Sequence, residues 1–141
     1  QARRPEEELV VAGLDAGAAP GVRSVGLIDR GAYRALLRRA RVYVTAPRRE
    51  DYGIAQLEAL ADGCMLVTSP APGPYVALEL ARRLDPRLVG GDLAGALRAA
   101  LDTPRGDYPS AAAVELEPFT PASVDRLVAE RVWPALAGGL A

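Results

Sequence analysis

The sequence has no lysine, no histidine and only one cysteine, Cys64, among its 141 residues. A single cysteine cannot form an internal disulfide bond. Without histidine, a tetrahedral zinc site would have only carboxylates and this one thiolate as ligands. We therefore expect no structural metal, no cofactor and no disulfide framework. Because no histidine is present to act as a base for Cys64, we expect this residue to fill the core rather than to act as a nucleophile.

All 17 basic residues are arginine, and 18 acidic residues leave a net charge of −1. The arginines are spread along the chain, whereas nucleic-acid-binding proteins concentrate basic residues on one face. No apolar run approaches the roughly 20 residues that a membrane-spanning helix needs, and the amino terminus has no signal-peptide pattern. We expect a cytoplasmic protein with no nucleic-acid partner and no membrane span. Because the sequence opens with Gln1, we expect its natural start to lie upstream.

Short apolar runs alternate with amphipathic segments along most of the chain. The runs are typical of buried strands, and apolar residues at i, i+3, i+4 and i+7 are typical of helices. Strands are predicted at residues 8–13, 23–27, 42–45, 64–68 and 87–89, and helices at 30–40, with Asp29 as N-cap, 54–62, 76–83, 93–101 and 121–136. This alternation predicts an α/β fold, a Rossmann-like doubly wound parallel sheet with helices on both faces. In such sheets ligands bind at the carboxyl ends of the strands.

One glutamate departs from the amphipathic pattern of the helix that follows Gly53. At about 100° per residue the apolar residues of this helix form a stripe, and Glu58 borders the stripe beside Ile54 and Ala61. A carboxylate at the edge of a buried face is destabilising by about 1–3 kcal/mol or more unless it has a partner. The two adjacent hydroxyl groups of a ribose match the two carboxylate oxygens. An arginine side chain is the alternative partner.

Glu50 and Gly53 lie in the loop between a predicted strand and this helix, at the rim where ligands bind. Because Gly53 has no side chain, the amide N–H groups and the positive end of the helix dipole are open to a phosphate. An ordinary turn at the start of a helix is the alternative explanation for the glycine. Two glutamates carry little information in a chain with 18 acidic residues, so their context decides.

The segment from residue 42 to 70 combines these features in a specific order. An apolar strand is followed by Pro47, Glu50, Gly53, the run Glu58-Ala-Leu-Ala, Gly63 and a second apolar strand that ends in Thr68-Ser-Pro. This order resembles the group 1 retaining glycosyltransferases, whose two-domain architecture is called GT-B. The run EDYGIAQLE is similar to their motif of two glutamates separated by seven residues. The resemblance covers about two-thirds of the chain, from Val10 to the helix at 93–101.

The resemblance implies roles for the residues of this motif. In that family the glutamate matching Glu58 holds the ribose hydroxyl groups. The glutamate matching Glu50 contacts the transferred sugar, so Glu50 is the expected catalytic residue. Backbone amides near Gly53 and Ile54 are expected to contact the phosphate and the sugar.

The resemblance also concerns the base and the diphosphate. The backbone of Val25 and Gly26 is expected to lie along the edge of the nucleotide base. Family members carry an earlier strand and helix, with an arginine and a lysine that neutralise the leaving diphosphate, and this stretch is absent here. Neutralisation of this charge, a large part of catalysis, is expected to fall either to arginines such as Arg48 and Arg49 or to residues missing from this sequence.

The protein implied by the resemblance is a glycosyltransferase of the hexosyltransferase type, of which this chain supplies the donor-binding half. Residues 1–102 are expected to form that domain, incomplete at its start. Residues 103–141 are expected to form a turn-rich region and a long helix that pack on the same domain. Because the amino-terminal acceptor domain is missing, the isolated chain is expected to bind a nucleotide sugar without catalysing transfer. The uncovered sheet edge is expected to let the fragment self-associate.

Two other functions stay open. A nucleotide-sugar epimerase has the same two-domain fold and uses the same kind of donor. A non-catalytic module would keep the fold only as an interaction surface. Phe119 and Trp133 fit either the packing of the last helix towards a partner domain or ordinary places in the core.

Overall fold

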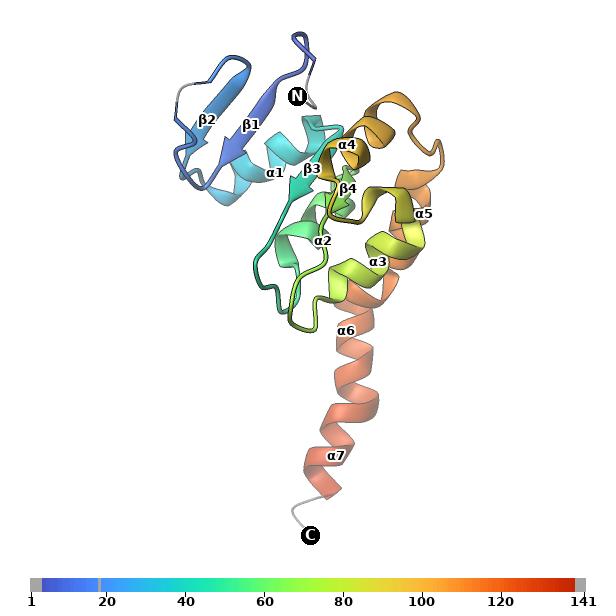
Figure 1. The fold of residues 1–141 in the computed structure, drawn as a ribbon. Coiled ribbons are helices and arrows are strands. Elements are labelled where there is room, and N and C mark those ends of the chain that lie inside the picture. The colour runs from blue at the N-terminus through green and yellow to red at the C-terminus, as the bar shows by residue number, and fades with distance from the viewer. Residues whose placement is uncertain (1–3, 18, 139–141) are drawn as a thin grey trace.

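The computed structural model describes residues 4–17 and 19–138 of the chain. It is a mixed α/β structure, which confirms the coarse fold class (Figure 1). Its elements in chain order are β1 (Leu9–Ala12), β2 (Val22–Gly26), α1 (Arg30–Arg39), β3 (Val42–Thr45), α2 (Ile54–Ala61), β4 (Met65–Thr68), α3 (Val76–Leu84), the 3₁₀ turn η1 (Pro86–Leu88), α4 (Leu93–Asp102), α5 (Tyr108–Glu115), the 3₁₀ turn η2 (Glu117–Phe119), α6 (Pro121–Leu127), the π-helical turn η3 (Val128–Val132) and α7 (Trp133–Gly138). None of the helices in these described ranges is long and apolar enough to cross a membrane.

The four strands form two separate parallel pairs. β1 pairs with β2, with Leu9 opposite Val22, and β3 pairs with β4, with Val42 opposite Met65. Parallel strands need a crossover connection, and α2 supplies it between β3 and β4. The described residues therefore form two short parallel ladders and no single continuous sheet.

Helix α1 begins after Asp29 as the sequence predicts and ends at Arg39, one residue before the predicted end. The Asp29 carboxylate, as N-cap, accepts a hydrogen bond from the backbone N–H of Ala32 at 2.9 Å. Arg38 and Arg39 occupy the last turn, where positive charge interacts favourably with the helix dipole. Leu37 is the buried residue of the helix and packs against the core residues Ala59 and Cys64.

The core is centred on β4, whose four residues are all buried. Helices α2, α3, α4 and α5 contribute the side chains that surround it, which are Leu60, Ala81, Leu84, Ala96, Ala100, Tyr108 and Ala112. One polar contact joins this packing to the backbone, because the Leu66 N–H donates to the Tyr108 hydroxyl at 3.2 Å. Tyr108 thereby satisfies a buried amide of β4.

Two predicted segments differ in the structure. The strand expected at 87–89 is mostly the 3₁₀ turn η1, and only Val89 forms a parallel bridge, to Thr68. The turn-rich region expected after residue 103 contains the start of α5 at Tyr108. Pro109 does not prevent this helix, since a proline in the first turn lacks only an N–H that has no partner within the helix.

The carboxyl-terminal helix, residues 121–138, stretches away from the rest of the molecule (Figure 1). No residue of α6, η3 or α7 is buried, and Trp133 is 69 % exposed. The idea that Trp133 is an ordinary core residue is therefore wrong, and the helix is not packed onto the domain in this structure. Phe119, just before the helix, makes an edge-to-face contact with Tyr52 at 6.3 Å between ring centroids.

Replacing Tyr108 by Phe tests the polar contact in the core. The change leaves the buried Leu66 N–H without its acceptor, so we expect the free energy of unfolding to fall by about 1–3 kcal/mol. Urea denaturation followed by circular dichroism measures this loss. Tyr52→Phe removes a hydroxyl from a residue that is 46 % exposed and should leave the urea midpoint unchanged. Equal effects of the two substitutions would contradict the assigned role of Tyr108.

Candidate functional site

The loop between β3 and α2 folds around the Glu50 carboxylate. Oε1 of Glu50 accepts hydrogen bonds from the backbone N–H groups of Asp51, Tyr52 and Gly53 at 3.2, 3.4 and 3.1 Å. Oε2 accepts one from the side-chain amide of Gln56 at 3.1 Å. Led by the Gln56 amide, these donors hold the pKa of Glu50 below its ordinary value, against the opposing effect of burial. Glu50 is thus a fixed carboxylate at the amino end of α2.

Two glycines let a second loop pack tightly against this one. Gly53 has a φ of 89°, and a Cβ there would lie 2.7 Å from the Cβ of Ala77 and 3.0 Å from the ring of Tyr75. Gly73 has a φ of 113°, and a Cβ there would lie 2.2 Å from the carbonyl oxygen of Glu50. Both its conformation and the lack of space exclude a side chain at Gly53, which gives a structural reason for this glycine at the start of α2.

The Gly53 amide that was expected to receive a phosphate is already occupied. It donates to Glu50 within the chain, so the carboxylate lies where an anion would approach the start of α2. Ile54, the first residue of this helix, has a side chain that is 66 % exposed. Gly53 and Ile54 thus lie together beside Glu50, at the carboxyl end of β3.

Glu58 lies on α2 in a different setting from the predicted one. The buried side of α2 consists of Gln56, Ala59 and Leu60, whereas Ile54 and Ala61 are exposed. The prediction that Ile54 and Ala61 belong to the buried stripe is wrong. Most sides of this eight-residue helix carry apolar residues, so its sequence alone does not determine which side is buried.

The partner of Glu58 in this structure is an arginine, as the second alternative had it. Its Oε1 lies 3.2 Å from Nη2 of Arg30 and 3.9 Å from Nη1 of Arg34, both on α1. The Glu58 side chain is 23 % exposed and that of Arg30 is 81 % exposed. The pair is therefore open to solvent on the arginine side.

Asp62, which follows α2, fixes that helix against α1. Its carboxylate pairs with Arg34 through two hydrogen bonds, one of them at 2.8 Å, and with Arg38 at 3.3 Å. Arg34, followed by Arg38, holds the pKa of Asp62 below its ordinary value of 3.8, while burial acts in the opposite direction. These contacts keep Glu58 beside the amino-terminal half of α1.

Val25 and Gly26 end β2 next to a small pocket. The Gly13 N–H donates to the Gly26 carbonyl at 2.8 Å, which joins the ends of β1 and β2. A pocket of about 150 Å³ lies beside this contact, lined by Ala12, Gly13, Leu27, Ile28 and Tyr33. The backbone of Gly26 therefore lies next to a mostly apolar hollow at the carboxyl ends of two parallel strands.

Arg48 and Arg49 are exposed in the loop that follows β3. Arg49 pairs with Asp51 at 3.2 Å. Both residues lie within a few positions of Glu50, so the loop brings positive charge to the same end of the strand. Neither arginine side chain is part of the hydrophobic core.

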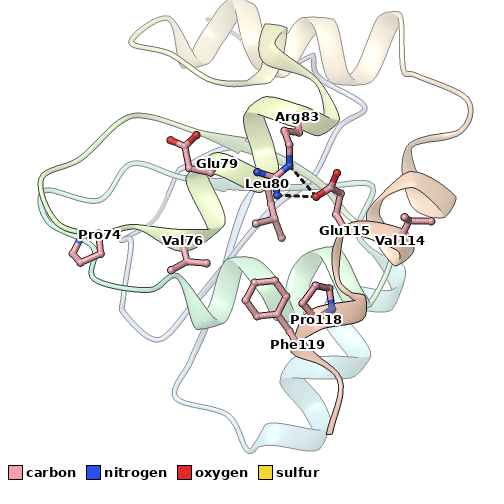
Figure 2. A pocket seen from close by; sticks show the side chains of 9 residues that line it. All are labelled: Pro74, Val76, Glu79, Leu80, Arg83, Val114, Glu115, Pro118 and Phe119. Atoms are coloured by element: carbon pink, nitrogen blue, oxygen red, sulfur yellow. Dashed lines mark hydrogen bonds and ion pairs between the residues drawn. The ribbon is translucent and has the colours of Figure 1, made fainter. Parts of the chain in front are cut away.

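A larger groove lies on another face of the molecule. It has a volume of about 580 Å³ and is formed by α3, α5 and η2. Figure 2 shows the ion pair between Arg83 and Glu115 across it, at 2.7 Å. None of the site residues predicted from the sequence lines this groove.

Cys64 occupies the core, as predicted. Its thiol is fully buried and donates to the Leu37 carbonyl at 3.1 Å, and burial raises its pKa to about 11. A thiol with such a pKa is a poor nucleophile near neutral pH. Within residues 4–17 and 19–138 no group of three or more Cys, Asp or Glu side chains is arranged to hold a metal ion.

Sequence reasoning missed two residues of the site, Gln56 and Tyr75. Gln56 bonds to Glu50 and is buried, although it lies in a helix whose apolar stripe was expected to point elsewhere. Tyr75 is the one non-glycine residue in the described part of the chain with a positive φ, 29°. The signal for Gln56 was available, since an amide side chain between apolar neighbours of a short buried helix needs a polar partner.

Comparison with known proteins identifies no relative: no protein-family model, no curated protein and no solved structure matches the chain.

The ion pairs of Asp62 predict how stability depends on pH. Because folding lowers the pKa of Asp62, its contribution is present above its unfolded value and is lost as the pH falls through the folded value. We expect the free energy of unfolding to decline below about pH 4. In Asp62→Asn that part of the decline should be missing, with lower stability at neutral pH. Urea titrations from pH 6 to pH 3 measure both.

The exposed Asp125 provides the matched control for this experiment. Asp125→Asn should leave the pH dependence of stability as it is in the parent protein. An equally steep acid decline in Asp62→Asn and in the parent would contradict the assigned role of the Arg34–Asp62 pair.

Proposed function

We propose that the chain is the nucleotide-sugar-binding domain of a retaining glycosyltransferase of group 1, the class that transfers a sugar from a nucleoside diphosphate to an acceptor bound elsewhere. The observation that carries the proposal is the fold of the segment EDYGIAQLE. It forms a loop and a helix at the carboxyl end of β3. Glu50 is held by backbone amides at the start of this helix, and Glu58 lies on one side of it. Both carboxylates stay outside the hydrophobic clusters.

The order of groups from β2 to α2 supports this proposal. The pocket beside Gly26 offers an apolar place for a base, with backbone groups at its edge. Arg30, in the first turn of α1, contacts Glu58, so the carboxylate proposed to bind the ribose lies close to the start of α1. Gly53 and Glu50 follow at the amino end of α2. Base, ribose and sugar would occupy these places in turn, and the diphosphate between ribose and sugar would lie near the arginines, because the Gly53 N–H is already bound to Glu50.

The arginine partner of Glu58 is compatible with ribose binding. A solvent-exposed ion pair contributes only about 0–1 kcal/mol, and Arg30 is 81 % exposed. Two ribose hydroxyl groups are donors that replace the guanidinium at little cost. The arginine released in this way, with Arg48 and Arg49, adds positive charge near the diphosphate.

The finer fold is part of the same proposal. We infer that both strand pairs belong to one Rossmann-like doubly wound sheet, in which a further parallel strand lies between β1 and β3. Among the described residues β1 pairs only with β2, and β3 pairs only with β4, so each has a free edge. Leu9 and Val44 on these strands are exposed apolar residues, which a neighbouring element would cover. Such a strand would carry the missing charge-neutralising residues.

Transfer itself requires more than this chain. An acceptor domain must close over the donor to exclude water and complete the site. We therefore expect the isolated chain to bind donor nucleotides and to show no transferase activity.

Isothermal titration calorimetry with six compounds tests the proposal. These are the nucleoside diphosphates UDP, GDP and ADP and the nucleotide sugars UDP-glucose, GDP-mannose and ADP-glucose. We expect one nucleotide series to bind and Glu58→Ala to weaken it at least tenfold, since a carboxylate that accepts two hydroxyl hydrogen bonds contributes about 1.5–3 kcal/mol or more. The unfolding free energy of Glu58→Ala should stay within about 1 kcal/mol of the parent value.

Glu79→Ala is the control, because Glu79 is also a helical glutamate paired with an arginine, Arg82, at 2.6 Å. It should leave nucleotide affinity unchanged. Binding that persists in Glu58→Ala would assign Glu58 to the Arg30 pair alone. No heat change with any of the six compounds would argue against a donor site and in favour of a non-catalytic interaction module.

A further inference from the structure

A chain of buried hydrogen bonds runs from Glu50 to the end of β4. Gln56 Nε2 lies 3.1 Å from Glu50 Oε2 and 3.4 Å from the Tyr75 hydroxyl. That hydroxyl lies 2.6 Å from Oγ1 of Thr68, which is 3.4 Å from the carbonyl oxygen of Ser69. Gln56, Tyr75 and Thr68 are 3 %, 1 % and 0 % exposed. The chain therefore links the carboxyl ends of β3 and β4 beneath the rim.

The donors and acceptors of this chain have one consistent arrangement. An ionised carboxylate only accepts, so the Gln56 amide nitrogen donates to Glu50, and its second N–H donates to the Tyr75 oxygen. The Tyr75 hydroxyl then donates to Thr68, and the Thr68 hydroxyl donates to the Ser69 carbonyl. Reversing the Gln56 amide would place its oxygen against the carboxylate. The orientation of Gln56 is thus fixed from both sides.

The chain determines which oxygen of Glu50 remains available. Oε1 is surrounded by the three backbone amides of the loop, whereas Oε2 has the Gln56 amide as its partner. A carboxylate oxygen has two lone pairs, so Oε2 retains one acceptor position. Oε2 is therefore the Glu50 oxygen with an acceptor position left for a further donor, such as a sugar hydroxyl.

Tyr75 is held in place at a cost in backbone energy. Its φ of 29° is unfavourable for a residue with a bulky side chain, and such conformations persist where the surroundings determine them. The Tyr75 ring packs so closely against Gly53 that a Cβ added there would lie 3.0 Å from it, and the Tyr75 hydroxyl contacts Thr68. This strained residue therefore fixes the far side of Gln56.

We propose that Gln56 and Tyr75 are positioning residues that orient the Glu50 carboxylate so that Oε2 accepts a hydroxyl hydrogen bond from the sugar of a nucleotide-sugar donor. The inference rests on the proposed function, because it assigns the sugar contact to Glu50. It adds that discrimination between the nucleotide sugar and the bare nucleoside diphosphate depends on two residues that touch neither of them.

The measured quantity is the ratio of the Kd of the nucleoside diphosphate to the Kd of its nucleotide sugar, for whichever of the three pairs binds. Gln56→Leu removes the donor to Oε2 at similar volume, and we expect this ratio to fall about tenfold while the Kd of the bare diphosphate stays within about twofold. Tyr75→Phe leaves the Gln56 contact to Glu50 in place but frees its far side, so a fall of about threefold is expected.

Carbon-13 NMR of the glutamate carboxyl groups supplies a second readout that a purely structural role would not change. The Glu50 resonance is assigned by its loss in Glu50→Gln. The pKa of Glu50 should rise towards its ordinary value in Gln56→Leu, because the amide is the leading cause of its lowering. The matched control is Tyr108→Phe, which also removes a buried tyrosine hydroxyl but lies outside this chain. It should change neither the pKa nor the ratio.

Each outcome decides between the two ideas. A lower ratio in both variants, with the control unchanged, supports the inference. If the parent protein discriminates between diphosphate and nucleotide sugar but the variants keep the same ratio, the inference is overturned and the proposed function stands. The inference is also overturned, and the proposed function stands, if the parent protein binds the diphosphate and the nucleotide sugar equally. If none of the six compounds binds to the parent protein, the proposed function fails and the inference falls with it.

Discussion

The burial of β4 is the constraint on which the rest of the structure depends. All four of its residues are buried, with helices α2 to α5 supplying the side chains around them. A buried strand cannot leave its amides unpaired, so β3 takes one edge and the Tyr108 hydroxyl takes the Leu66 N–H. Packing and backbone hydrogen bonding thus fix where β4 ends. That end, at Thr68, is where the hydrogen bonds towards Glu50 begin.

The position of the candidate site follows from this strand pair. Because β3 and β4 are parallel and in register, their carboxyl ends lie together and the two loops that follow must share the same space. Gly53 and Gly73 make this close approach feasible, since a Cβ at either position would collide with the other loop. The consequence is a rigid rim in which the Glu50 backbone and carboxylate are both held. Rigidity of this kind favours selective binding, because little ordering remains to be done when a ligand arrives.

The sequence predicted the positions of strands and helices better than it predicted which side of each helix is buried. The four strands and helices α1 to α4 lie where apolar runs and periodicity indicate. The orientation of α2 was not predictable, because most of its residues are apolar and only tertiary packing selects the side with Ala59 and Leu60. Helix α5 was missed because glycine and proline near residue 108 are typical of turns, whereas proline in a first turn is also compatible with a helix.

For the candidate site residues, too, some can be predicted from the sequence and others depend on tertiary packing. Glu50, Gly53 and Glu58 stand out by their spacing in one segment, and spacing is a property of the sequence. Gln56 is marked in the sequence only as an amide that needs a polar partner. Which partners it has, Glu50 and the Tyr75 hydroxyl 19 residues away, depends on tertiary contacts that no local pattern specifies.

Glu50, in the loop before α2, and Glu58, within α2, lie towards opposite ends of the helix dipole. Glu50 lies at the amino end, where the N–H groups stabilise a negative charge without help from any cation. Glu58 and Asp62 lie towards the carboxyl end, where the dipole disfavours negative charge, and arginines of α1 offset this. A ligand of Glu58 must therefore replace what Arg30 supplies, namely N–H or O–H donors. Neighbouring hydroxyl groups meet that requirement and an anionic group does not. At the other end the Gly53 N–H is bound to the Glu50 carboxylate, so both ends of α2 present a carboxylate and favour hydroxyl donors over anions.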